Sequence, residues 1–304
     1  MVLIISLDIE GAFDNAWWPA LRHQLIKKRC PRNIYAMINL YLSDRKIVVN
    51  YARTTSERDT TKGCVQGSIG GPIFWNIILD PLLQKLTDEG VYCQTFADDG
   101  VLVCSDHTVN IMEESANAIL QKVVKWGEEK KLTFAAHKTN AMLLTKKLKF
   151  NLPKPYMSGN ILQLIDQIKL LGIIIDRKLT FKSHVTAVCK KAAEIYKQLA
   201  CAAKVTWGLN GEITRTIYVA VIEPIVLYAS SVWAPVTELQ MIRDQLDNLQ
   251  RGFAQKICRA YRTVSLTASL VLSGLLPLDL RVQEAASLYK AKKGISTDYL
   301  PPSS

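Results

Sequence analysis

The first residues of the chain form the feature that most limits its fold. Val2–Leu7 is an almost unbroken apolar run that ends at Asp8, which is typical of a strand buried on both faces. Such a strand needs hydrogen-bonded neighbours, and all of them must come from later in the chain. The sequence therefore predicts a sheet completed by downstream strands, with a carboxylate where the first strand ends. The abrupt start also favours a chain that begins inside a domain.

Short apolar runs and helical patterns alternate after this strand. Further strands are predicted at Ile47–Tyr51, Thr60–Cys64, Cys93–Phe96, Val101–Cys104, Ala141–Leu144 and Ile168–Ile175. Helices are predicted from Pro19 to about Lys28 and at Asn33–Leu42, Ile73–Leu86 and Val109–Lys130. The pattern indicates an α/β (α+β) fold, with helices packed on a mixed or antiparallel sheet.

The second half of the chain has a different pattern. Long helical segments without strand alternation are predicted at His184–Thr206, Glu212–Ser231 and Glu238–Arg262. The net charge of +11 is uneven, with +3 in residues 1–150 and +8 in residues 151–304. We expect an all-α unit whose basic surface suits a polyanion such as nucleic acid, although a solvated basic surface explains the charge alone equally well.

Composition excludes several classes of protein. With 49% apolar and 21% charged residues, the chain is neither disordered nor collagen-like. The 7 cysteines show no C-x-x-C spacing and lie mostly in apolar runs, which predicts reduced thiols in an intracellular protein. No apolar segment reaches the roughly 18 residues of a membrane span, and we expect no membrane partner. The first residues lack the basic region of a signal peptide.

Three carboxylates stand where strands end or turn. Asp8 follows the first strand, and Asp98 and Asp99 lie in a tight turn between two short apolar runs. If that hairpin pairs beside the first strand, the three carboxylates converge, and a divalent cation with oxygen ligands such as Mg²⁺ would hold them ionised together. Two such ions could support an in-line phosphoryl displacement. The alternative is a solvated hairpin turn, which favours Asp and Gly for its own reasons.

Five short sequence motifs follow one another along the chain. They are Asp8–Asp14, Gln66-Gly67-Ser68 with Gly71-Pro72, Phe96-Ala97-Asp98-Asp99, Leu132-Thr133-Phe134 with His137-Lys138-Thr139, and Lys169-Leu170-Leu171-Gly172. Together they resemble the palm motifs of reverse transcriptases. The sequences of Phe13–Trp18, Arg259–Ser265 and Gly274–Pro277 resemble those of non-LTR retrotransposons, in particular the type-1 insect elements that insert into ribosomal RNA genes.

The resemblance implies a polymerase right-hand fold. Residues 1–176 would form the palm, from the first motif to the primer grip, and residues 177–304 a helical thumb and C-terminal nucleic-acid-binding region. The family's fingers precede the first motif, so the chain would be a fragment of a Pol polyprotein that also carries an endonuclease. We expect the isolated chain to polymerise poorly.

The resemblance also assigns roles to particular residues. Two Mg²⁺ ions, with Mn²⁺ as a possible substitute, would be held by Asp8, Asp98, Asp99 and the Ile9 carbonyl. Nucleotide binding would involve Phe13, Gln66, Gly67 and Lys138, and the primer grip Leu171 and Gly172. Phe13 would exclude a 2′-hydroxyl, Gln66 and Gly67 would pack against the new base pair, and Lys138 would lie near the triphosphate. Packing or solvation remains an alternative explanation for Phe13, Gln66, Gly67 and Lys138.

The implied reaction is RNA-templated DNA synthesis. Its partners would be an RNA template, a DNA primer or target in ribosomal DNA, and dNTPs, with the nucleus as the site of action. One alternative is a catalytically inactive nucleic-acid-binding remnant of such an element. Another is a different palm-type enzyme such as a nucleotide cyclase, which leaves Gln66-Gly67, the Lys138 segment and the basic helical half unexplained.

Overall fold

The computed structural model describes residues 1–145, 147, 150–202 and 208–295. The chain forms two compact units, Met1–Leu171 and Gly172–Ser304. This division lies a few residues before the expected boundary at 176. The interpretation of the first unit as a palm and the second as a thumb stays a prediction.

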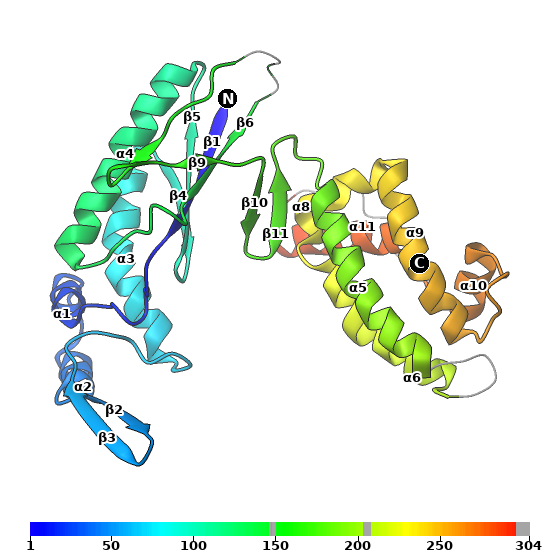
Figure 1. Ribbon diagram of the computed structural model, residues 1–304, viewed down its shortest axis with the longest axis horizontal. Helices are drawn as coiled ribbons and strands as arrows, with labels where there is room; N and C mark the ends of the chain where they lie inside the picture. The colour runs from blue at the N-terminus through cyan, green and yellow to red at the C-terminus, as the bar shows by residue number, and fades with distance from the viewer. Residues whose placement is uncertain (146, 148–149, 203–207, 296–304) are drawn as a thin grey trace. The chain divides into compact units, whose positions relative to one another are not determined.

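A mixed five-stranded sheet forms the centre of the first unit, in the order β4-β5-β1-β6-β9. The middle strand is β1 (Val2–Asp8), which pairs antiparallel with β5 (Asp99–Ser105) and with β6 (Asn140–Leu144). The outer strands are β4 (Tyr92–Phe96), antiparallel to β5, and β9 (Gln163–Leu164), parallel to β6. The first strand is thus completed by downstream strands on both sides, and the predicted mixed sheet is confirmed (Figure 1).

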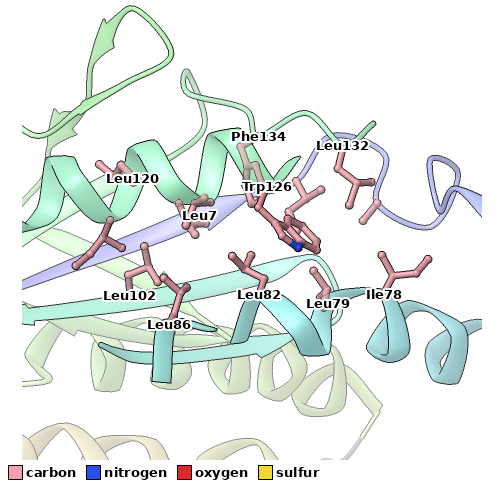
Figure 2. Packing of buried hydrophobic residues seen from close by; sticks show 14 of the residues in the cluster. Leu7, Ile78, Leu79, Leu82, Leu86, Leu102, Leu120, Trp126, Leu132 and Phe134 are labelled. Carbon is pink, nitrogen blue, oxygen red and sulfur yellow. The ribbon is translucent and has the colours of Figure 1, made fainter. Parts of the chain in front are cut away.

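One face of this sheet packs against two long helices, α3 (Gly70–Asp88) and α4 (Val109–Lys130). Successive side chains of a strand point to opposite faces, and Leu3, Ile5 and Leu7 of β1 all belong to the core shared with these helices. Figure 2 shows Leu7 and Leu102 of the sheet against Leu82 of α3 and Leu120 of α4. Asp8 therefore lies on the face turned away from α3 and α4.

The remaining elements of the first unit are short. They are α1 (Trp18–Lys27), α2 (Arg32–Leu42), the hairpin β2 (Lys46–Tyr51) to β3 (Thr54–Asp59), the pair β7 (Tyr156–Met157) and β8 (Asn160–Ile161), and β10 (Gln167–Leu170). The strand predicted at Thr60–Cys64 is wrong, because β2 turns at Ala52-Arg53 and pairs with the polar segment Thr54–Asp59 instead. Backbone hydrogen bonds to β2 outweigh the low apolar content of that segment.

The strand predicted at Ile168–Ile175 is also corrected. It is divided into β10 and β11 (Ile173–Asp176), which a turn separates. Leu171 and Gly172 turn the chain with φ of +47° and +86°, values that no strand residue adopts.

Helices make up the second unit after β11, as predicted. They are α5 (Lys182–Ala202), α6 (Gly211–Ile217), the π-helical turn η1 (Tyr218–Ile222), α7 (Glu223–Leu227), α8 (Ser230–Trp233), the 3₁₀ turn η2 (Ala234–Glu238), α9 (Gln240–Ile257), α10 (Leu266–Ser273) and α11 (Leu278–Lys292). The helices predicted at His184–Thr206 and Glu238–Arg262 correspond to α5 and α9, and residues 203–206 of the former lie outside the described residues.

The single helix predicted at Glu212–Ser231 is wrong. Pro224 has no N–H to donate, and the turn before it widens into η1. Ala229 then ends the helical path with φ of +52°. Across the described ranges no single helix has the length and apolar composition of a membrane span, and only the bent pair Gly211–Leu227 and Ser230–Glu238, with a 52° bend, meets both criteria together.

Candidate active site

Two of the predicted carboxylates meet at the paired ends of β1 and β5. Asp8 is directly opposite Asp99 in the antiparallel register. Directly opposed side chains share one face of a sheet, with Cβ atoms about 5 Å apart. Phe96 pairs with Asp99 to close the hairpin, so Ala97 and Asp98 alone form its turn. The expectation that the hairpin pairs beside the first strand is confirmed, and it brings the three carboxylates together.

The charges of these carboxylates affect one another. Partial burial raises the pKa of the Asp99 carboxyl above its ordinary value, and the negative charges of Asp98 and Asp8 raise it further. A cation placed beside Asp99 would therefore favour its ionised form.

Asp8 has a fixed backbone and a carboxylate oxygen with spare bonding capacity. Its N–H donates to Thr139 Oγ1 at 3.4 Å, and its C=O accepts from the Ala135 N–H at 2.9 Å. The carboxylate Oδ2 is buried and accepts no hydrogen bond from the described residues. Lys138 Nζ forms an ion pair with this oxygen at 3.6 Å. The predicted triphosphate-binding lysine thus lies beside the predicted metal ligand.

The carbonyl of Ile9 points to the β5 side of β1. The Glu10 N–H donates to Thr133 C=O at 2.9 Å, on the side of β1 away from β5. Because the N–H and C=O of a trans peptide point in opposite directions, the Ile9 C=O of the same peptide points to the β5 side. This orientation fits an additional oxygen ligand beside Asp8 and Asp99.

A divalent cation fits the chemistry of these groups. They offer only oxygen, one of them buried without a hydrogen-bond donor, and their mutual repulsion favours a cation. In the described part of the chain, no three His, Cys, Asp or Glu side chains are already arranged around one metal position. Asp8 and Asp99 are fixed by strand pairing, and the turn carrying Asp98 would complete the ligand set.

Phe13 is connected to the carboxylate hairpin through Trp75 of α3. The two rings lie with centroids 5.9 Å apart, and the Phe13 C=O accepts from the Cys64 N–H at 2.7 Å. The Trp75 indole Nε1–H donates to the Ala97 C=O at 2.6 Å. The sequence did not identify Trp75, because an aromatic residue in an apolar helix gives no sign of what its N–H will bond.

Gln66 and Gly67 are exposed in the loop that leads into α3. The loop is anchored near Phe13 by the Cys64 N–H. Gly67 has φ of +79°, and nothing lies within 4 Å of where a Cβ would be, so a ligand could approach the backbone closely. Leu171 and Gly172 form the turn at the boundary of the two units, and their primer-grip role stays a prediction.

The family described as "Reverse transcriptase (RNA-dependent DNA polymerase)" matches residues 2–175. The chain belongs to this family, which is the class that the paired carboxylates and the ordered motifs indicate.

Its relatives are proteins of mobile elements. The chain is 32% identical over 295 residues to a "Putative 115 kDa protein in type-1 retrotransposable element R1DM" of Drosophila melanogaster, covering 96% of this chain and 28% of the relative. It is 28% identical to a "Retrovirus-related Pol polyprotein from type-1 retrotransposable element R1" of Bradysia coprophila, with 97% and 29% coverage. The resemblance to type-1 elements is confirmed, and the chain spans less than a third of the length of these two relatives.

Among solved structures, telomerase from Candida albicans in complex with an RNA fragment covers 98% of this chain at a TM-score of 0.44 and 13% identity, and the match spans 48% of that chain.

Proposed function

We propose that the chain is the catalytic part of a non-LTR retrotransposon polymerase that copies RNA into DNA. The observation that carries the proposal is the direct pairing of Asp8 with Asp99, beside the Asp98 turn, in a member of the reverse transcriptase family. Asp8 Oδ2, which is buried, accepts no hydrogen bond from the described residues and lies 3.6 Å from the Lys138 ammonium, supports a cation there.

Asp8, Asp98, Asp99 and the Ile9 carbonyl would hold two Mg²⁺ ions, or Mn²⁺ in their place. When bound, the ions would activate the primer 3′-hydroxyl and neutralise the leaving pyrophosphate. Asp8 and Asp99 contribute carboxylate oxygens, and the pairing of β1 with β5 fixes the backbone of both residues. Their preorganisation lowers the cost of aligning the reacting groups.

The neighbouring residues would bind the incoming nucleotide. Lys138 ion-pairs with Asp8 and is exposed enough to turn to a triphosphate. There its charge would offset the charge that develops on the leaving group. Phe13, supported by Trp75, would occupy the space that a 2′-hydroxyl needs. Gln66 and Gly67 would pack against the new base pair.

We further propose that the second unit and the primer grip at Leu171 and Gly172 bind the template and primer. The +8 charge of residues 151–304 supports backbone contacts with an RNA template and a DNA primer. The proposal also includes ribosomal DNA as the target and dNTPs as the substrates. It further includes an endonuclease elsewhere on the parent polyprotein and a nuclear site of action.

The decisive experiment is Asp98→Asn in the full-length parent polyprotein, because the isolated chain is expected to polymerise poorly, with Asp88→Asn as the matched control. Asp88 is an exposed carboxylate at the end of α3, away from the hairpin turn. Extension of a DNA primer on RNA should be abolished in the first variant and kept in the second, while RNA–DNA binding is unchanged in both. Extension that survives Asp98→Asn would rule out the proposed catalytic site.

A further inference from the structure

Trp75 is a completely buried tryptophan whose N–H is bonded next to the candidate catalytic turn. Its side chain has no exposed surface, and its Nε1–H donates to the Ala97 C=O at 2.6 Å. Ala97 immediately precedes Asp98. A buried N–H donor is thus joined to the backbone of the turn that carries a predicted metal ligand.

The turn needs such support. Ala97 has φ of +55°, a left-handed conformation that is unfavourable for alanine. The turn has only two residues, and the side chain of Asp98 is exposed. The Ala97 C=O and the Asp98 N–H belong to one rigid peptide plane. A bond that fixes this carbonyl therefore fixes the direction in which the chain enters Asp98.

The ring of Trp75 has a second contact. Its centroid lies 5.9 Å from that of Phe13, with 35° between the ring planes. Trp75 therefore contacts both Phe13, which is proposed to select the sugar of the nucleotide, and the turn with Asp98, which is proposed to bind the metal.

Trp126 provides an internal comparison. It lies on α4 in the same core, where Figure 2 shows it beside Phe134 and Leu132. Its Nε1 is buried and has no hydrogen-bond partner among the described residues. A bonded indole N–H is thus not a general property of tryptophans in this core.

We propose that Trp75 is a positioning residue that sets the Ala97–Asp98 turn and supports Phe13. The proposal rests on the proposed polymerase function for its catalytic meaning. Because Trp75 is completely buried, it would act through the Ala97 carbonyl and the Phe13 ring and not by contact with substrate. It is a link between sugar selection and metal binding within one unit.

The test compares Trp75→Phe with Trp126→Phe in the whole chain. Both substitutions keep an aromatic ring in the core and remove an indole N–H. Hydrogen exchange measured by mass spectrometry should show about tenfold less protection in β4–β5 for Trp75→Phe, the value of one lost hydrogen bond, with β6 unchanged. Mn²⁺ affinity, measured from the free-ion electron paramagnetic resonance signal, should fall several-fold. Trp126→Phe should change neither quantity.

Two results would overturn the proposal. One is unchanged exchange in β4–β5 of Trp75→Phe. The other is an equal loss of protection in β4–β5 and β6, which indicates general destabilisation. Failure of the polymerase function has a different signature: Mn²⁺ binding that is the same in wild type and Asp98→Asn. The exchange comparison still decides whether Trp75 holds the turn in that case.

Discussion

At the level of single residues, Asp99 has a carboxyl that the fold makes harder to ionise. Its pKa is raised by partial burial and by the charges of Asp98 and Asp8. Between the unfolded value of about 3.8 and the raised folded value, the folded state binds more protons than the unfolded state. The contribution of Asp99 to the free energy of unfolding is therefore fully present below this pH window, and it decreases as the pH rises through the window.

Asp99→Asn should accordingly stabilise the metal-free protein at pH 7. Solvent screening of this exposed group limits the gain in unfolding free energy to about 0.5 kcal/mol. Urea unfolding in EDTA measures it, with Asp88→Asn as control, and the gain should disappear near pH 3. Added Mn²⁺ should stabilise wild type more than the variant. A variant that is less stable than wild type in EDTA would contradict the expected repulsion.

Phe13→Val tests the selection of sugar. Because the smaller side chain leaves space for a 2′-hydroxyl, rNTP incorporation relative to dNTP should rise by about 10–100-fold. Single-nucleotide addition with each substrate by the full-length parent polyprotein measures the ratio. Phe74→Val is the control, since Phe74 packs on Tyr41 with centroids 6.1 Å apart. An unchanged ratio in Phe13→Val would assign this ring to packing alone.

At the level of secondary-structure elements, α6 and α9 of the second unit approach each other closely. Gly211 opens α6, and an added methyl group would overlap the carbonyl oxygen of Ile257 at the end of α9. The helices can meet at this point only because the side chain is a hydrogen atom.

Gly211→Ala should destabilise the protein by about 1–3 kcal/mol through this overlap. Gly70→Ala is the control, since its methyl group would lie 3.4 Å from the Phe74 ring, an ordinary contact. Thermal unfolding followed by circular dichroism measures both. Equal melting temperatures for Gly211→Ala and wild type would show that α6 and α9 do not meet as closely as described.

Burial of His184 makes the second unit sensitive to acid. Burial lowers the pKa of the His184 imidazole, whose Nδ1 accepts from the Ile174 N–H at 3.4 Å and whose Nε2 is buried without a bond in the described structure. The unfolded chain, with a pKa of about 6.5, then binds more protons than the folded one. The contribution of His184 to the free energy of unfolding is fully present above pH 6.5, the unfolded pKa, and it decreases as the pH falls below that value.

His184→Asn keeps an acceptor near the Nδ1 position and should remove this part of the acid sensitivity. The measurement is urea unfolding from pH 7.5 to 5, with the exposed His23→Asn as control. An acid-induced loss of stability that is identical in His184→Asn and wild type would show that other groups cause it.

Local patterns in the sequence predict the elements that carry the carboxylates. The apolar run before Asp8 and the short hairpin runs predict β1, β4 and β5, and the helical repeat of Val109–Lys130 predicts α4, which packs on the same sheet. The pairing of β1 with β5 follows once both strands must be buried. Features set by distant contacts were not predictable: β3 forms because β2 is beside it, and the bond from Trp75 to Ala97 joins elements with unrelated sequence patterns.

At the level of the whole molecule, net charge differs between the two halves of the chain. The carboxylates lie in the first half, of net charge +3, and the second half carries +8. The loop after α9 presents exposed Arg259 and Arg262 beside Tyr261, and neither arginine forms an ion pair with the described residues. Arg251 and Gln255 fix this loop by donating to the carbonyls of Arg262 and Val264.

A rigid basic loop is suited to contacting phosphates. The double variant Arg259→Gln/Arg262→Gln should weaken binding of an RNA–DNA duplex and lower the slope of log K against log salt by roughly 1–2, since each lost phosphate contact releases one counterion fewer. Fluorescence anisotropy between 50 and 300 mM salt measures the slope.

The matched control is Lys27→Gln/Lys85→Gln in the first unit. These lysines share a surface pocket with Asp80, Asp88 and Glu89, whose charges oppose phosphate binding. Because both double variants remove two positive charges, a general loss of long-range attraction would affect them equally. A lower salt slope only in the arginine variant would therefore place the duplex on the loop after α9. Equal slopes in the two variants would instead indicate that the basic residues of the second half form a solvated surface that does not contact the duplex.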